Sequence, residues 1–269
     1  MTRLGIFGGG QLAQMLTQAA VSLGVETVIF ERSADSPAGR LTHAEIVGAW
    51  EDAALLDTFV SQCDLVTLEN EFVDAAILAS LESQGVPVFP SAATLAVIQD
   101  KLLQKERIAA AGLRVPAFRR ADTPDDVLVA AEAFGWPLLL KARRNGYDGY
   151  GNATVRSSAD VVSAWQRLAR GGNSLLVEAF VPFMRELAVM VVRGRDGETR
   201  AYPVVETVQQ QHICHLVRAP APIARTEAAE ATALAIAAVE AVAGVGIFGV
   251  ELFAMADGHM LFNELAPRP

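Results

Sequence analysis

The chain has 269 residues and a formal net charge of −9, from 31 acidic side chains against 22 Lys plus Arg. Hydrophobic residues make up 52% and charged residues 20%, a balance that excludes a disordered chain. The acidic charge argues against nucleic acid as a partner, because binding to a phosphate backbone needs clustered Lys and Arg. No run reaches the roughly 20 apolar residues of a membrane span. Cys63 and Cys214 belong to no Cys/His cluster, and with no signal-peptide pattern at the start we expect a reduced, cytoplasmic protein.

Residues 1–95 alternate between strand-like and helix-like patterns. Apolar runs typical of strands lie at 4–7, 25–30, 65–68 and 86–89, with helical spacing between them at 12–23, 52–62 and 74–84. Such alternation predicts an α/β domain with a doubly wound parallel sheet and helices on both faces.

A glycine turn separates the first strand from the first helix. The spacing Gly8-x-Gly10-x-x-Ala13, with Glu31 at the end of the next strand, matches the dinucleotide-binding fingerprint. Such a turn lets the backbone approach a phosphate at the helix amino terminus. Three interpretations stay open: a nicotinamide site, a site for another nucleotide or sugar phosphate, or a tight turn without a ligand. Glu69-Asn70-Glu71 follows the strand at 65–68, where open sheets bind ligands; the alternative is that these residues cap the next helix.

The pattern of predicted elements changes after residue 95 and again after residue 174. Residues 96–174 predict a linker helix at 98–111 and a small α+β domain with helices at 123–134 and 159–170. Residues 175–269 are rich in strands and predict an antiparallel sheet with one helix at 226–243. Its strands are expected at 175–178, 186–193, 199–206, 213–218, 247–254 and 259–264.

A glycine-rich loop follows the strand Leu138–Lys141. This loop, 143–151, leads into another strand-like stretch at 153–156, so it is not a P-loop, which has to open a helix. Glycines at this density suit a lid whose N–H groups close over phosphates, and Lys141 would hold phosphate oxygens as a point charge. The alternative is an ordinary hairpin with a solvated lysine.

Two carboxylates are predicted to face each other near the end of the chain. Asp257-Gly258 between two apolar runs indicates a two-residue type I′ turn, which places Glu251 opposite Glu264 on one face. Like charges at this spacing need a shared proton, a basic side chain or a cation between them. A divalent cation such as Mg²⁺ accepts one or two carboxylates together with substrate phosphates. The alternatives are a pair with shifted pKa values, as in glycosidases, or a solvated hairpin face.

Six short runs of residues, spread along the whole chain, together form a recognisable pattern. They are Gly8-Gly9-Gly10-Gln11-Leu12, Gln99 to Lys105, Lys141 with Gly146 to Gly151, Arg185-Glu186-Leu187, Tyr202-Pro203 and Asn263 to Pro269. Together these runs resemble the ATP-grasp superfamily and, within it, the 5-(carboxyamino)imidazole ribonucleotide synthase family of purine biosynthesis.

The resemblance implies roles for individual residues. Lys101, Lys141 and the lid would contact the phosphates of ATP, with Arg268 facing an anionic intermediate as a second catalytic cation beside Lys141. Glu251 and Glu264 would hold Mg²⁺. The further nucleotide contacts implied are Gly146, Tyr147, Asp148, Gly149, Tyr150, Gly151, Asn152, Glu178, Ala179, Phe180, Val181, Glu186 and Asn263, of which Glu178 to Val181 lie along the adenine and Glu186 at the ribose. The substrate ribonucleotide would contact Gly8, Gly10, Gln11, Leu12 and Glu71.

The function implied is an ATP-dependent ligase that carboxylates 5-aminoimidazole ribonucleotide with bicarbonate through carboxyphosphate. The alternatives are another ATP-grasp carboxylate–amine ligase, an ATP-binding unit without turnover, or a nicotinamide-dependent oxidoreductase. Gln209 stands where the family usually has a nucleotide-contacting histidine. The family usually continues beyond Pro269 with His-Asn-Ser-Gly-His, so the last domain is expected to lack its carboxyl-terminal part. We expect small-molecule substrates and a homodimer.

Overall fold

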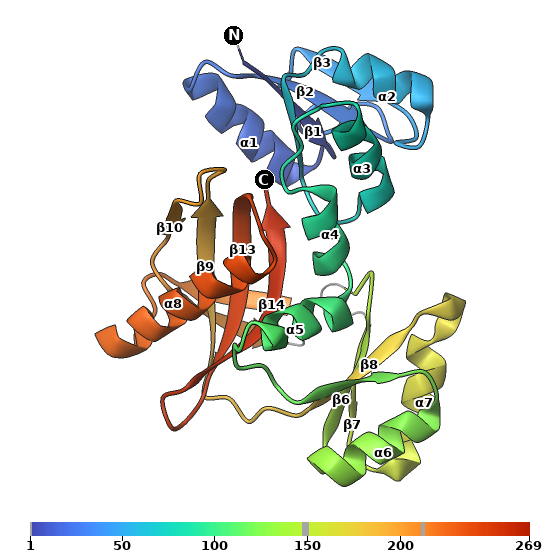
Figure 1. Cartoon of the computed structure of the whole chain (residues 1–269), viewed down its shortest axis with the longest axis vertical. Coiled ribbons are helices and arrows are strands. Elements are labelled where there is room, and N and C mark those ends of the chain that lie inside the picture. The colour runs from blue at the N-terminus through green and yellow to red at the C-terminus, as the bar shows by residue number, and fades with distance from the viewer. Residues whose placement is uncertain (1, 147–150, 211–212) are drawn as a thin grey trace.

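Three β-sheets, each packed against helices, make up the described part of the chain (Figure 1). The computed structural model describes residues 2–146, 151–210 and 213–269. One sheet belongs to the amino-terminal unit, a second to a small unit in the middle of the chain, and the third to the carboxyl-terminal unit. Two helices run between the first unit and the other two. The α/β fold predicted from the sequence is confirmed.

The amino-terminal sheet has four parallel strands in the order β3-β2-β1-β4. Its helices begin at local signals such as the Asp52 and Asp74 side chains, which accept hydrogen bonds from the first turns of two of them. The elements are β1 (Arg3–Phe7), α1 (Gln11–Ser22), β2 (Glu26–Glu31), β3 (Ala44–Val47), α2 (Ala53–Val60), β4 (Leu65–Leu68) and α3 (Ala75–Ser83).

One strand of this sheet was not predicted, and one prediction was wrong. β3 has a short apolar run and lies at the sheet edge, so its pattern is weak. The run 86–89 forms only an isolated bridge between Val66 and Val88. Pro87 lacks the N–H that a longer ladder needs, and Pro90 ends the run.

Aromatic side chains fill the core of this unit. Phe59 is fully buried, with its ring centroid 5.1 Å from that of Phe7 and 5.3 Å from that of Phe30. It also lies over Gly5, where an added Cβ would come within 2.6 Å of the Phe59 ring. The amino-terminal unit therefore depends on this ring.

We expect Phe59→Ala to lower the free energy of unfolding by about 3–5 kcal/mol, because it leaves a cavity among buried rings. Urea unfolding followed by the fluorescence of Trp50, which packs on Phe7, measures the change. Leu23→Ala, at a side chain that is 79% exposed, is the control and should cost under about 0.5 kcal/mol. Equal effects of the two substitutions would contradict the role given to Phe59.

Two helices, α4 (Ala92–Ile98) and α5 (Lys101–Ala110), replace the single helix predicted at 98–111. The break lies at Asp100, which is extended and caps α5 through its carboxylate. The predicted domain boundary after residue 95 therefore falls inside α4.

The small middle sheet has the order β5-β8-β6-β7 and is antiparallel. The run at 175–178, predicted to belong to the last domain, is instead β8 in this sheet, because it pairs with both β5 and β6. The elements are β5 (Phe118–Ala121), α6 (Pro124–Phe134), β6 (Leu138–Ala142), β7 (Asn152–Val155), α7 (Ser158–Leu168), a 3₁₀ turn (Arg170–Gly172) and β8 (Leu175–Ala179).

The carboxyl-terminal sheet has the order β12-β11-β9-β13-β14, with β10 also paired to β9. Alternate residues of β13 are buried against α8, so its other face is free to carry polar side chains. The elements are β9 (Arg185–Arg193), β10 (Thr199–Ala201), β11 (Val205–Gln210), β12 (Ile213–Arg218), α8 (Arg225–Ala241), β13 (Gly246–Ala254) and β14 (Met260–Arg268). In the described part of the chain, no helix is long and apolar enough to cross a membrane.

Candidate functional site

All three lysines of the chain lie in one cluster where α5 meets the small and the carboxyl-terminal sheets. Lys101 and Lys105 are one turn apart on α5, and Lys141 is on β6. Lys101 forms an ion pair with Glu264 on β14. The other two share Glu178 on β8: Lys105 Nζ lies 3.2 Å from Oε1, and Lys141 Nζ lies 3.0 Å from Oε2.

Burial and charge act in opposite directions on these groups. Burial alone would raise the pKa of Glu178, but Lys141 and Lys105 outweigh burial and lower it. Burial would likewise lower the pKa of Lys101, and Glu264 more than reverses that effect. The pKa of Glu264 is lowered as well, chiefly by Lys101 against the effect of burial, so Lys101 and Glu264 are both charged at neutral pH.

The β13–β14 hairpin places Glu251 directly opposite Glu264, as predicted. The predicted two-residue type I′ turn is wrong. Met255 N donates to His259 O at 2.9 Å and Gly258 N donates to Met255 O at 3.0 Å, so the loop has three residues. Gly258 has φ +84°, the left-handed position that closes such a loop.

A β-bulge explains why the pairing was still predicted correctly. Leu252 pairs with Phe262 and Glu251 pairs with Glu264, so Asn263 is an extra residue on β14. The longer loop shifts the register by one residue, and the bulge shifts it back.

At the bulge, the Asn263 side chain contacts one of the two paired carboxylates. Asn263 Nδ2 donates to Glu251 Oε2 at 3.2 Å, while Asn263 Oδ1 is buried without a donor among the described residues. Burial, then the carboxylates of Glu264 and Glu186, raise the pKa of Glu251 to about 7. Carboxylate and amide oxygens are the ligands that Mg²⁺ prefers, so the residues present fit this ion. No three His, Cys, Asp or Glu side chains in the described ranges form a metal cluster.

An open cleft runs along the polar face of β13 and β14. It is lined by residues from all three units of the chain. These are Asn70, Glu71, Phe72, Lys101, Lys141, Gly146, Asn152, Glu186, Gln209, Cys214, Glu251, Asn263, Glu264, Ala266 and Arg268.

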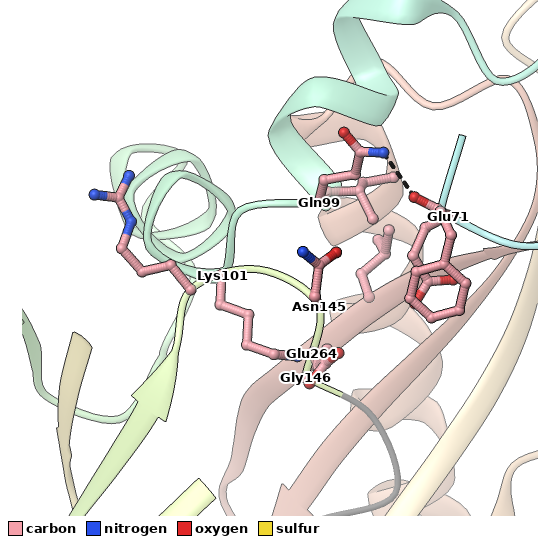
Figure 2. A pocket seen from close by; sticks show the side chains of 10 residues that line it. Glu71, Gln99, Lys101, Asn145, Gly146 and Glu264 are labelled. Atoms are coloured by element: carbon pink, nitrogen blue, oxygen red, sulfur yellow. Dashed lines mark hydrogen bonds and ion pairs between the residues drawn. The ribbon is translucent and has the colours of Figure 1, made fainter. Parts of the chain in front are cut away.

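The linker between α4 and α5 joins the amino-terminal unit to this cleft. Gln99 Nε2 donates to the carbonyls of Glu71 and Val73, each at 2.6 Å. Figure 2 shows the bond to Glu71 and, at the start of α5, Lys101 extending toward Glu264. Gln99 therefore fixes the backbone at Glu71, which lines the cleft together with Lys101 and Lys141.

Arg268, at the end of β14, borders the same cleft. A Cβ at Gly249 on the neighbouring strand would lie 3.4 Å from Arg268 Nε and 3.4 Å from Met190 Sδ. The glycine therefore leaves room for the guanidinium to lie across the sheet.

The family models divide the chain at the α4–α5 linker. Residues 1–99 match the ribonucleotide synthetase preATP-grasp domain, and residues 106–269 match the ATP-grasp domain. The chain belongs to the ATP-grasp family.

Relatives of this ATP-grasp chain bear out the resemblance stated from its sequence. It is 40% identical over 265 residues to the N5-carboxyaminoimidazole ribonucleotide synthase of Synechococcus elongatus, covering 98% of this chain and 66% of that protein. It is 40% identical over 269 residues to the phosphoribosylaminoimidazole carboxylase of Schizosaccharomyces pombe, covering 99% and 48%. The chain thus spans only about half to two thirds of the curated relatives that it matches.

A crystal structure shows the same fold. N5-carboxyaminoimidazole synthase from Aspergillus clavatus, in complex with ADP and 5-aminoimidazole ribonucleotide, matches with a TM-score of 0.91 at 34% identity. The match covers 99% of this chain and 70% of that one.

The lid of the ATP-grasp domain is held at its base. Asp100, the cap of α5, also binds Arg143 at the end of β6, with Nε 2.9 Å from Oδ1 and Nη2 2.5 Å from Oδ2. Lys101 N donates to Arg143 O at 2.9 Å. One carboxylate therefore fixes both the start of the lysine-bearing helix and the root of the glycine loop.

Only part of the lid itself is described. Gly146 and Asn152 line the cleft, and Gly151 O accepts a hydrogen bond from Ala142 N at 2.7 Å. Tyr147, Asp148, Gly149 and Tyr150 lie outside the described residues.

The predicted adenine contacts lie at the end of β8 and in the segment that leads to β9, and the predicted ribose contact lies on β9. Ala179, Phe180 and Val181 are partly exposed there, whereas the Glu178 side chain is buried against lysines. Glu186 accepts a hydrogen bond from Gln209 Nε2 at 3.0 Å, so Gln209 contacts the predicted ribose ligand.

The glycine turn is closed by a carboxylate from its own unit. Glu69 accepts hydrogen bonds from the N–H groups of Gly10, Leu12 and Ala13 at 2.9, 3.1 and 3.3 Å. These N–H groups are the donors that a phosphate would use at the start of α1. A ribonucleotide phosphate at this turn stays a prediction, and it would have to displace Glu69.

Of the five predicted substrate contacts, Glu71 is the one that the cleft brings beside the lysines. The other four, Gly8, Gly10, Gln11 and Leu12, do not border the cleft in the described part of the chain. Sequence reasoning missed Asp100, Arg143 and Lys105. Asp100 could have been found, because an Asp directly before a helix is a typical cap. No sequence signal indicates that Lys105 pairs with Glu178.

Proposed function

We propose that this chain carries the ATP-dependent ligase activity of its relatives, in which ATP, bicarbonate and 5-aminoimidazole ribonucleotide give the N-carboxylated ribonucleotide, ADP and phosphate. The observation that carries the proposal is the convergence of Lys101, Lys141 and Arg268 with Glu251 and Glu264 in one cleft. Three cations beside two carboxylates suit a triphosphate and its metal ion.

The position of each residue in the cleft indicates its role in the proposed reaction. Lys141, nearly buried at the cleft wall, would hold phosphate oxygens and neutralise charge that develops during transfer. Arg268 would hold the carboxyphosphate formed when bicarbonate attacks the γ-phosphate. The lid would exclude water, because carboxyphosphate hydrolyses readily once solvent reaches it.

Glu251, Glu264 and the Oδ1 of Asn263, which has no donor among the described residues, would hold Mg²⁺. The bound ion would neutralise phosphate charge as a Lewis acid. In that state Glu251 would lose the proton that its raised pKa favours, since a nearby cation stabilises the carboxylate.

Phosphate release tests the proposal. With MgATP, bicarbonate and 5-aminoimidazole ribonucleotide, we expect ADP and phosphate to form, and chelation of the metal with EDTA to stop the reaction. Binding of MgATP without ribonucleotide-dependent phosphate release would contradict the ligase proposal.

A fluorescence titration with reduced nicotinamide cofactor tests the oxidoreductase alternative. We expect no binding, because the chain matches the preATP-grasp and ATP-grasp domains. Bicarbonate as the carboxyl donor, a homodimer and a cytoplasmic location remain predictions from the sequence.

A further inference from the structure

Lys105 is a buried charge that the proposed mechanism does not use. Its side chain is 2% exposed, and the described cleft is lined by Lys101 and Lys141 but not by Lys105. Burying an ammonium is costly unless its charge is balanced. Because Lys105 does not line the cleft, we expect it to affect a bound ligand through the residues that it contacts.

Lys105 touches both sheets that form the cleft. Its Nζ lies 3.2 Å from Glu178 Oε1 on β8 and donates to Asn263 O on β14 at 3.1 Å. The other oxygen of Glu178 binds Lys141 at 3.0 Å. Lys105 is therefore joined to Lys141 through a single carboxylate.

The charges around Glu178 do not balance. One carboxylate faces two ammonium groups, so the cluster keeps an excess positive charge next to the cleft. Burial, and then the Lys141 ammonium, lower the pKa of Lys105 to about 8 despite the attraction of Glu178. Because little water screens this charge, an anion entering beside Lys141 is strongly attracted.

We propose that Lys105 is a positioning residue that prepares Lys141 for a phosphate group by sharing the carboxylate of Glu178. Without Lys105, Glu178 and Lys141 would form a neutral pair that competes with the phosphate for the Lys141 ammonium. The inference rests on the proposed function, because it takes the phosphate group of ATP as the ligand of Lys141.

The test combines binding with lysine spectroscopy. Since the chain has three lysines, selective ¹⁵N labelling of lysine Nζ gives three signals, which substitution of each residue assigns. In Lys105→Met we expect the Lys141 signal to move in the nucleotide-free protein and the Kd for MgATP to rise about tenfold. Lys105→Gln, which removes the charge but keeps a polar side chain, should raise the Kd similarly and serves if the Met variant does not fold.

A double substitution separates charge from packing. Lys105→Met combined with Glu178→Gln removes one charge of each sign, so Lys141 regains an unshared charge and the Kd should return toward the wild-type value. Gln104→Met is the matched control, because Gln104 is buried on α5 and bonds to Leu265 without contacting Glu178. It should lower the melting temperature and leave both the Lys141 signal and the Kd unchanged.

Two results would overturn the proposal: a folded Lys105 variant with an unmoved Lys141 signal and wild-type Kd, or a double variant that binds no better than Lys105→Met. Failure of the wild-type protein to bind MgATP would instead refute the proposed function. The Lys141 signal of the nucleotide-free protein would still report on the link through Glu178.

Discussion

Glu264→Gln should lower ribonucleotide-dependent phosphate release by at least about 100-fold. Glu264 binds Lys101 and faces Glu251 across the hairpin, so one uncharged amide weakens both the metal site and the lysine contact. The fold should survive, because Gln has the same shape and Glu251 still acts electrostatically on Lys101. Phosphate release at saturating MgATP, with circular dichroism of the same sample, measures both effects.

Glu240→Gln is the control for this prediction, since Glu240 is an exposed carboxylate on α8. It removes the same charge and should leave turnover unchanged. Near-normal phosphate release by Glu264→Gln would show that the paired carboxylates do not hold the metal on which turnover depends.

The sequence predicts the position of these carboxylates better than it predicts the hairpin that holds them. The alternating pattern of both strands sets which face Glu251 and Glu264 share, and this part of the prediction holds. The alternating pattern could not predict the loop type or the bulge at Asn263, because each of them depends on the backbone conformation of a single residue. The two shifts cancel at the one pair that matters for the site.

The other site residues that the sequence did not predict are held by contacts between elements far apart in the chain. Lys105 and Glu178 are 73 positions apart and Asp100 and Arg143 are 43 apart, so no periodicity connects them. Glu178 lies within β8, and the family resemblance implied that it contacts the adenine. Its side chain points inward because two buried lysines balance it there.

Asp100 should contribute about 3 kcal/mol to folding through Arg143, because removing one partner of a largely buried ion pair leaves the other charge unbalanced. The two side chains are 6% and 14% exposed. Asp100→Asn keeps a good helix cap and loses the ion pair, whereas Asp100→Ala loses both and should cost about 1 kcal/mol more. Urea unfolding followed by the fluorescence of Trp136 and Trp165 in the small unit measures both variants.

The same carboxylate makes stability depend on pH in a defined direction. Burial alone would raise the pKa of Asp100, but Arg143 outweighs burial and lowers the pKa below the ordinary value of 3.8. The unfolded chain therefore binds this proton first as pH falls, so the contribution is complete above pH 3.8 and is lost as pH drops through the lower, folded-state pKa. Asp100→Asn should then lose less stability than the wild type over that acid range. An equal acid-induced loss in the two proteins would show that Asp100 and Arg143 are not paired in solution, and the root of the lid would need another anchor.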